Sequence, residues 1–528
     1  MPQGLSFDEL HVVSDLHLGG AEGFQIFDAG AELAWLADQV TDSKAAGLAA
    51  LVINGDFIDF LAEAPALAFD PDGATAKIDR VMGDAAFRPV FAAFKRLLAQ
   101  PNRRLVINLG NHDLELALPW VRRHLACQLA DDDAARSRLL LVADGTGFAC
   151  QVGPARVVCL HGNEVDSWNV TDFERLRRVG RDRQCGQDSV AWTPNAGAQL
   201  VVEVMNQVKR DYPFVDLLKP ETEAVLPILA ALNPQLLRRL DELSGIARRK
   251  AADAARMRAG FLSADQPASP AAQYSAAPAG PRAPAPDPWA PPAPGLQQSR
   301  AQDLLARAEQ AWQANPDAMA QLQGQAGEQL GVLSATWSWL TGKSRAEVLR
   351  KALDFLDKDQ SFDLFARDDT FLGIDALVSP EVDIVVTGHT HLARSLKRQR
   401  GFGHYFNSGS WATLMQISPA VRQDADRFAR LFKLLDGSKV PALRAAEPEL
   451  VLNRRTAVRV WRDGGSLARA ELILVMADAA GIRAEPMAGT ACEITGTACE
   501  ITGTACEITG TASAIPGPSA ALPLATQA

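Results

Sequence analysis

The sequence predicts a layered α/β domain that is interrupted by a helical insertion and followed by a disordered tail. Short apolar, β-branched segments alternate with amphipathic helical stretches in the first 165 residues, a pattern typical of stacked strands and helices. Strands of the same kind resume after residue 376, beyond a long segment with helical periodicity. We therefore expect one α/β domain in two parts, residues 1–165 and 377–476.

The predicted strands are runs of β-branched and apolar residues between turn residues. In the first part these runs are Leu10–Ser14, Ala49–Asn54, Arg104–Leu109, Phe148–Val152 and Arg156–Leu160. In the second part they are Asp383–Thr387, Tyr405–Asn407, Ala457–Trp461 and Glu471–Val475. Gly153-Pro154 indicates a hairpin between two of them, and the periodicity of Ala31–Ala46 and Ala85–Ala99 predicts helices.

The insertion, residues 166–376, and the tail, residues 477–528, differ from the α/β parts. Helical segments in the insertion are Gly197–Lys209, Glu223–Arg249, Gln298–Gln313 and Ser344–Leu356. Residues 264–297 are dense in Pro and Ala, which predicts a flexible linker. The tail repeats GTACEIT three times; its glycine and threonines oppose a helix, so we expect disorder, with metal binding by its cysteines as the weaker alternative.

The composition of the chain argues against some classes of binding partner and favours one location. Lys plus Arg number 53 and Asp plus Glu 63, so the net charge of −10 argues against a nucleic-acid partner. No apolar run is long enough for a transmembrane helix, although peripheral contact with a membrane through an amphipathic helix stays open. Seven cysteines, an odd number, and the lack of a signal peptide predict the reducing cytoplasm as the location.

Five short polar motifs lie at the ends of predicted strands. They are Asp15-Leu16-His17, Gly55-Asp56-Phe57-Ile58-Asp59, Gly110-Asn111-His112-Asp113, His161-Gly162-Asn163 and Gly388-His389-Thr390-His391. Each alone has a structural explanation as a turn, a helix cap or a buried histidine. Strand ends at one edge of an α/β sheet converge on a common crevice, and five of the eight histidines lie in these motifs. Together the motifs therefore predict a single site.

The residue types predict that this site holds metal ions. Aspartate, histidine and asparagine offer oxygen and imidazole donors without a thiolate, which favours manganese, with iron, zinc or magnesium as alternatives. Seven candidate donors exceed what one ion takes, whereas two divalent ions that share a bridging carboxylate would use them all. Such a pair binds a phosphoryl oxygen and activates water as hydroxide near neutral pH.

In these five motifs and their order the sequence resembles the calcineurin-like metallophosphoesterase superfamily. The resemblance covers about residues 9–168 and 383–411 and implies a two-sheet αββα sandwich. It implies that the first metal is bound by Asp15, His17 and His391, the second by Asn111, His161 and His389, and that Asp56 bridges both. It further implies that His112 stabilises or protonates the leaving oxygen and that Asp113 orients the His112 ring, with Asp59 outside the ligand set.

Within the superfamily, SDLHLG and GHTH look most like the bacterial UDP-2,3-diacylglucosamine pyrophosphatase group. Two departures put that substrate in doubt. Asn163 and the pair Leu392-Ala393 stand where that group usually has Asp and Arg-Pro, and the members of that group lack an insertion of this length. Because the insertion begins just after His161, we expect it to cap the site and to control substrate access.

Arginines near the start of the insertion have two interpretations. Arg175, Arg177 and Arg178 lie in a run of five arginines between residues 174 and 183. They form either an anion clamp for a second phosphate or, as charge runs usually do, a solvated helix face. Trp168 and Asn169 are candidates for contact with a base or sugar, or for the core.

The leading hypothesis is therefore a two-metal hydrolase that cleaves a small phosphate ester or pyrophosphate. One alternative is a nuclease of the same superfamily, which the acidic composition disfavours. Another is a non-catalytic scaffold that binds partners through the insertion; the complete set of seven donors opposes it. The sequence leaves the physiological substrate, the native metals and the oligomeric state open.

Overall fold

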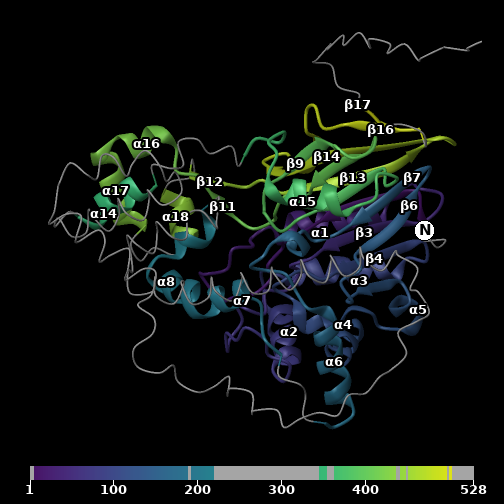
Figure 1. The fold of residues 1–528 in the computed structure, drawn as a ribbon, viewed down its shortest axis with the longest axis horizontal. Helices are drawn as coiled ribbons and strands as arrows, with labels where there is room; N and C mark the ends of the chain where they lie inside the picture. The colour runs from purple at the N-terminus through teal and green to yellow at the C-terminus, as the bar shows by residue number, and fades with distance from the viewer. Residues whose placement is uncertain are drawn as a thin grey trace, which may run out of the picture.

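The computed structural model describes residues 5–187, 192–218, 344–353, 362–435, 440–446, 450–495 and 499–501. Within these ranges two β-sheets pack face to face, and helices cover their outer faces. A separate helical lobe stands beside the sheets (Figure 1). The arrangement is the predicted αββα sandwich.

The larger sheet has nine strands in the described part of the chain, in the order β17-β16-β14-β13-β2-β3-β4-β5, with β15 beside β14. These strands are β2 (Glu9–Val13), β3 (Ala49–Asn54), β4 (Arg103–Asn108), β5 (Leu139–Val142), β13 (Thr456–Asp463), β14 (Leu467–Asp478), β15 (Gly481–Pro486), β16 (Cys492–Ile494) and β17 (Cys499–Ile501). Strands β2 to β5 run parallel, so β2, β3 and β4 end at the same edge.

The smaller sheet has six strands in the described ranges, in the order β1-β6-β7-β8-β10-β9. They are β1 (Leu5–Phe7), β6 (Phe148–Val152), β7 (Ala155–Cys159), β8 (Ile384–Thr387), β9 (Arg394–Lys397) and β10 (His404–Asn407). Strand β8 pairs in parallel with β7 and β10, although more than 200 residues separate β7 from β8 in the sequence. The sheet therefore joins the two predicted parts of the domain.

Three apolar layers hold the sandwich together. Val12 and Val52 of the larger sheet meet Val157 and Val386 of the smaller one in the layer between the sheets. Helices cover the outer face of the larger sheet; they are α1 (Gly30–Thr41), α2 (Ala74–Gly83), α3 (Arg88–Ala99), η1 (Leu114–Ala117), α4 (Pro119–Leu129) and α5 (Asp133–Arg136). Helix α15 (Asp369–Leu377) covers the smaller sheet through Phe371 and other apolar residues.

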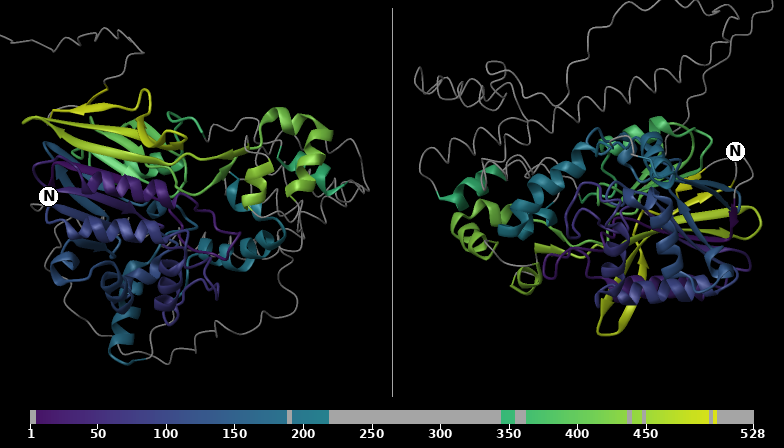
Figure 2. Two further views of the ribbon diagram at one scale, coloured as in Figure 1. Left: turned by 180° about the vertical axis from the view of Figure 1, so that it is seen from behind. Right: turned by 90° about the horizontal axis from the view of Figure 1, so that it is seen from below.

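The helical lobe has its own apolar core, which includes Phe214, Leu349 and Phe428. Its elements are α7 (Ala196–Leu200), the π-helical turn η3 (Val201–Met205), α8 (Asn206–Asp211), η4 (Pro213–Leu217), α14 (Arg345–Ala352), α16 (Pro419–Gln423), α17 (Ala425–Leu435) and α18 (Val440–Ala446). The short strands β11 (Leu414–Met415) and β12 (Val451–Leu452) link it to the sandwich. In all three views the lobe projects to one side of the strands (Figures 1 and 2).

Several helices pack against a different part of the protein from the one to which the predicted boundaries assigned them. The stretch 416–446 was assigned to the α/β domain, yet α16, α17 and α18 belong to the core of the lobe. Conversely, α15 and α6 (Phe173–Gln184) were assigned to the insertion but pack on the sandwich. The predicted helices 223–249 and 298–313 and the linker 264–297 lie outside the described residues.

The predicted tail begins too early. Strand β14 runs to Asp478, β15 follows, and the first two GTACEIT repeats contribute β16 and β17 to the larger sheet. In the first repeat Cys492 and Ile494 are buried between the sheets whereas Glu493 is only partly buried. Side chains that alternate between buried and partly exposed have the two-residue period of a β-strand. The prediction missed this strand because it considered only that glycine and threonine oppose a helix. Residues 496–498 and 502–528 lie outside the described part.

Candidate metal centre

The five motifs meet at one edge of the sandwich. Asp15, Asp56 and Asn111 follow β2, β3 and β4 of the larger sheet, and His161 and His389 follow β7 and β8 of the smaller one. The side chain of Asn54 joins the two sheets beneath this edge, because its Nδ2 donates to the backbone oxygens of Leu160 (2.7 Å) and Val386 (3.3 Å). The convergence expected from strand order is therefore present.

One group of donors comprises Asp15, His17, Asp56 and His391. The Nε2 atom of His391 lies 3.0 Å from Nε2 of His17 and 3.3 Å from Oδ1 of Asp15. His17 Nε2 is 3.7 Å from Oδ2 of Asp56. All four residues are buried, and one donor atom from each lies within 4.8 Å of the others. Two imidazole nitrogens at 3.0 Å with two carboxylates around them are the donor set of a divalent cation.

A second group reaches Asp56 through His161 and comprises Asn111, His161 and His389. His161 Nε2 is 3.2 Å from Oδ2 of Asp56, and the rings of His161 and His389 are 5.4 Å apart at their centroids. Both Asn111 Oδ1 and His161 Nε2 are buried; Asn111 Oδ1 has no hydrogen-bond partner among the described residues, and His161 Nε2 contacts the Asp56 carboxylate. Buried polar atoms are rarely left unpaired, so Asn111 Oδ1 indicates a ligand that binds at this group of donors.

The backbone at these motifs is strained in a consistent way. Five non-glycine residues in the described ranges have positive φ, and all five are predicted metal ligands: Asp15 (53°), His17 (49°), Asp56 (52°), His389 (70°) and His391 (61°). Left-handed conformations are costly for such residues and concentrate at functional sites. Hydrogen bonds between the loops that follow β2 and β3 hold these conformations: the backbone N–H groups of Leu16 and His17 both donate to the Asp56 carbonyl oxygen at 2.9 Å.

The glycines of the motifs are required by close packing against donor side chains. A Cβ at Gly55 would lie 2.2 Å from Nδ1 of His161, and one at Gly110 would lie 2.1 Å from Oδ1 of Asp56. A Cβ at Gly388 would come within 2.5 Å of Asp15 Oδ2. No side chain fits at these distances, so each glycine lets one strand end approach a donor from another strand.

The partner of His112 is Asp59, which corrects the prediction for Asp113. Asp59 Oδ1 lies 3.1 Å from Nδ1 of His112, and its Oδ2 lies 3.3 Å from Nδ1 of His17. Asp113 instead accepts hydrogen bonds from the backbone N–H groups of Phe57 (2.8 Å) and Gly110 (2.7 Å). Asp59 therefore orients two imidazole rings, whereas Asp113 fixes the two loops that carry Asp56 and Asn111.

The buried carboxylates of the centre favour the binding of cations. Burial raises the pKa of Asp15, and the Asp56 carboxylate adds to this rise, although His161 opposes it. Burial also raises the pKa of Asp113 to about 7, again with a contribution from Asp56. Burial favours the neutral ring of His161, but the carboxylates of Asp56 and Asp15 outweigh it and raise the His161 pKa to about 10. Divalent ions would displace the protons of Asp15 and His161 and balance the buried carboxylates.

The donors fit a pair of divalent ions. Asp15, His17 and His391 could hold one, Asn111, His161 and His389 the other, and Asp56 faces both groups. The unpaired atom, Asn111 Oδ1, belongs to the second group. None of the donors is a thiolate, which fits manganese, iron, zinc or magnesium.

The arginines of α6 are not brought to this cluster. Arg177 forms an ion pair with Glu174 at 2.8 Å on the exposed face of the helix. The side chains of Arg175 and Arg178 form no hydrogen bond or ion pair with a described residue. The anion clamp stays a prediction, and the packing of α6 gives it no support.

Sequence reasoning missed Asp166. Its Oδ2 lies 2.9 Å from Nε2 of His389, and Asn169 accepts a 3.2 Å hydrogen bond from Nδ2 of Asn111. Asn169 was considered as a substrate contact and Asp166 was not considered. The available signal was proximity in sequence, since both residues follow His161 within eight positions. The partly buried Trp168 packs against the lobe core.

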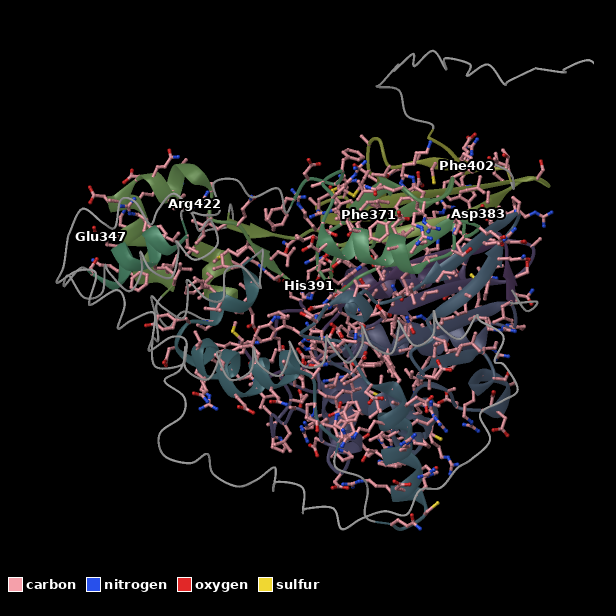
Figure 3. The ribbon with its side chains drawn as sticks, viewed as in Figure 1. Glu347, Phe371, Asp383, His391, Phe402 and Arg422 are labelled. Atoms are coloured by element: carbon pink, nitrogen blue, oxygen red, sulfur yellow. The ribbon has the colours of Figure 1, made fainter. Side chains whose placement is uncertain are left out.

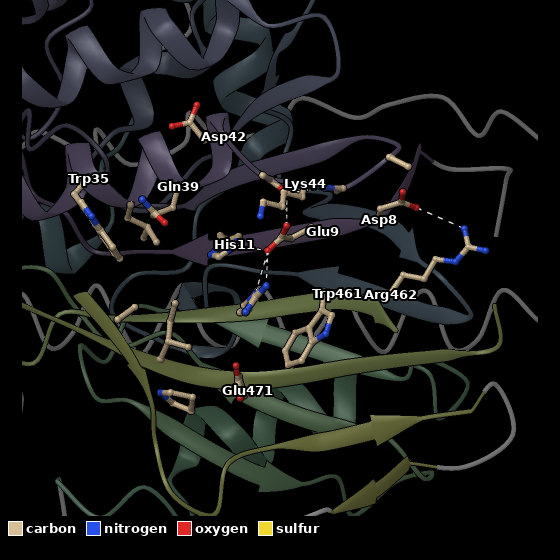
Figure 4. Close-up of a pocket in the computed structure, with 18 of the residues that line it drawn as sticks. Asp8, Glu9, His11, Trp35, Gln39, Asp42, Lys44, Trp461, Arg462 and Glu471 are labelled. Carbon is tan, nitrogen blue, oxygen red and sulfur yellow. Dashed lines mark hydrogen bonds and ion pairs between the residues drawn. The ribbon is translucent and has the colours of Figure 1, made fainter. Parts of the chain in front are cut away.

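A separate groove of about 1030 Å³ lies on the outer face of the larger sheet (Figure 4). Its lining includes Glu9 and His11 at the start of β2, remote from the end that carries Asp15, and Trp35 of α1. Glu9 accepts hydrogen bonds from Arg459, and the groove carries acidic and basic side chains in equal number. It contains none of the predicted ligands.

Comparison with known proteins agrees with this geometry. The model of the family described as calcineurin-like phosphoesterase matches residues 10–224, a range that contains five of the seven predicted ligands. No curated protein and no solved structure matches the chain. In the described ranges no helix has the length and apolar character needed to cross a membrane. The chain thus contains a domain of the calcineurin-like phosphoesterase family and is a metal-dependent phosphoester hydrolase.

Proposed function

We propose that the protein hydrolyses a small phosphate ester or pyrophosphate at a two-ion centre, with manganese as the preferred metal. The seven ligands of the proposal are Asp15, His17, Asp56, Asn111, His161, His389 and His391. The observation that carries it is the position of Asp56, whose Oδ2 faces His17 at 3.7 Å and His161 at 3.2 Å. A carboxylate between two groups of donors is what a bridging ligand requires.

When bound, the ions would supply Lewis acidity and lower the pKa of water toward neutrality. The chain itself would supply a proton donor. His112 lies at the rim of the cluster with its Nδ1 held by Asp59 at 3.1 Å, so Nε2 is the atom that would pass a proton to the leaving oxygen. Its ring stacks edge-on against His17 with centroids 4.7 Å apart, which keeps it beside the first group of donors.

The helical lobe supports a role of the insertion in substrate access. In the view of Figure 3, His391 lies at the side of the sandwich nearest the lobe. Asn206 of α8 donates to the Leu61 backbone oxygen at 3.1 Å, and Leu61 lies two residues after Asp59. Removal of residues 219–343 tests the part of the insertion between η4 and α14: a changed ranking of substrates is expected, and an unchanged ranking would count against a role of that part in access.

The test is hydrolysis of bis(p-nitrophenyl) phosphate and p-nitrophenyl phosphate with Mn²⁺, before and after chelation. We expect turnover that depends on the metal and falls by about 10²- to 10⁴-fold in His112→Ala. The matched control is His124→Ala, because His124 lies on α4 and pairs with Asp79 at the surface. Turnover that survives chelation, or equal rates in both variants, would contradict the proposal. Preferential cleavage of DNA would show that the substrate is a nucleic acid and not a small phosphate ester.

A further inference from the structure

A short turn after His161 connects two predicted ligands that come from different sheets. His389 Nε2 lies 2.9 Å from Asp166 Oδ2, and the same oxygen accepts a 2.6 Å hydrogen bond from Asn169 Nδ2. Asn169 Oδ1 in turn accepts a 3.2 Å hydrogen bond from Asn111 Nδ2. The chain His389–Asp166–Asn169–Asn111 is therefore continuous.

These contacts determine which atoms the two ligands present. The carboxamide of Asn111 uses its nitrogen to reach Asn169, so its oxygen, which is buried and unpaired, is the atom available to a cation. The ring of His389 uses Nε2 to reach Asp166, which leaves Nδ1 for a cation. Hydrogen bonds of this kind fix the tautomer and the orientation of metal-binding histidines.

The turn is anchored by the first helix of the lobe. The backbone N–H of Gly197, in the first turn of α7, donates to the backbone oxygen of Trp168 at 2.9 Å. Asn195 Nδ2 donates to the backbone oxygen of Asn169 at 3.2 Å. A Cβ at Gly197 would lie 1.9 Å from Asn169 Oδ1. The position of Asn169 therefore depends on how α7 packs.

We propose that Asp166 and Asn169 are positioning residues that prepare Asn111 and His389 for the second ion and link the occupancy of that ion to the packing of the lobe. The inference rests on the proposed function, because it assumes that these two ligands bind metal. It predicts a selective effect: the second ion is lost while the first, held by Asp15 and its neighbours, is kept.

The experiment measures Mn²⁺ binding to the full-length protein by titration calorimetry and by metal analysis after desalting. Asp166→Ala and Asn169→Ala are expected to weaken the affinity for the second ion by about 10- to 100-fold and to leave the affinity for the first ion unchanged. Asp166→Asn, which keeps an acceptor for the His389 ring, should restore part of the affinity. Gly197→Ala should reproduce the defect without a change in either positioning side chain.

The matched control is Asp172→Ala. Asp172 lies in the same segment and caps α6 by accepting from the Arg175 backbone N–H, but it touches no predicted ligand. It should bind both ions as the unmodified protein does. Unmodified protein that binds two ions, together with Asp166→Ala and Asn169→Ala that bind both equally well, would overturn the inference and leave the proposed function standing. Fewer than two ions on the unmodified protein would overturn both.

Discussion

Replacement of Gly110 with alanine is expected to disable the metal centre. The added Cβ would lie 2.1 Å from Oδ1 of Asp56 and 2.5 Å from its backbone nitrogen, whereas ordinary contact begins near 3.4 Å. The carboxylate must therefore move by about 1 Å or more, because both contacts involve buried atoms that cannot swing away. A displacement of about 1 Å at a reacting centre costs about 10²-fold in rate, or about 3 kcal/mol of transition-state stabilisation.

The assay is kcat/KM for bis(p-nitrophenyl) phosphate at saturating Mn²⁺, together with metal content and thermal unfolding. The control is Gly83→Ala at the end of α2, where an added Cβ would meet no atom within 4 Å. Both variants add one methyl group, so the comparison isolates the position of Asp56. We expect the Gly110 variant to lose about 10²-fold in kcat/KM and part of its metal, and the Gly83 variant to match the unmodified protein.

Two results would refute this reasoning. Full metal content with kcat/KM within twofold of the unmodified protein would show that Asp56 need not lie where the structure places it. An equal loss in the Gly83 variant would show that the defect comes from the added methyl group and not from the site.

Three further outcomes are expected. Asp59→Asn should lower kcat more than it lowers metal content, because the variant weakens the contact that orients His112; a loss of metal as large as the loss of kcat would contradict this. Burial raises the Glu115 pKa from 4.5 to about 7, so stability should fall as pH rises from about 4.5 to 7, and Glu115→Gln should remove about 3 kcal/mol of that fall in denaturant titrations. Arg398→Met should cost about 3–5 kcal/mol in the same titrations, because it leaves the buried Asp375 carboxylate without its 2.8 Å partner; a loss below 1 kcal/mol would contradict this.

The sequence predicted the parts of the fold that depend on local pattern. The strands that precede Asp15, Asp56 and Asn111 are apolar runs followed at once by polar residues, and the structure places them within one residue of the expected bounds. Parallel strands end at a common edge, so the convergence of these motifs followed from strand order. The same rule, applied to the second sheet, predicted that His161 lies close to these motifs.

The remaining features depend on distant packing that has no local signal. That Asp59 and not Asp113 contacts His112 is decided by the path of the backbone after β3, where Asp56 adopts positive φ. Assignment of α17 to the lobe is decided by contacts with α14, which is separated from it by β8, β9 and β10. Strand β16 was missed because Gly and Thr in the repeat suggested disorder, although the alternation of Cys492 and Ile494 was visible.

The central claim is that Asp56 stands between two metal ions. Crystals grown with Mn²⁺ and measured at the manganese absorption edge test it directly, because anomalous scattering locates each ion independently of the refined protein. The account predicts two peaks about 3.5–4 Å apart, one beside His17 and His391, the other beside Asn111 and His161, with Asp56 in contact with both. A single peak, or two peaks without Asp56 between them, would contradict it.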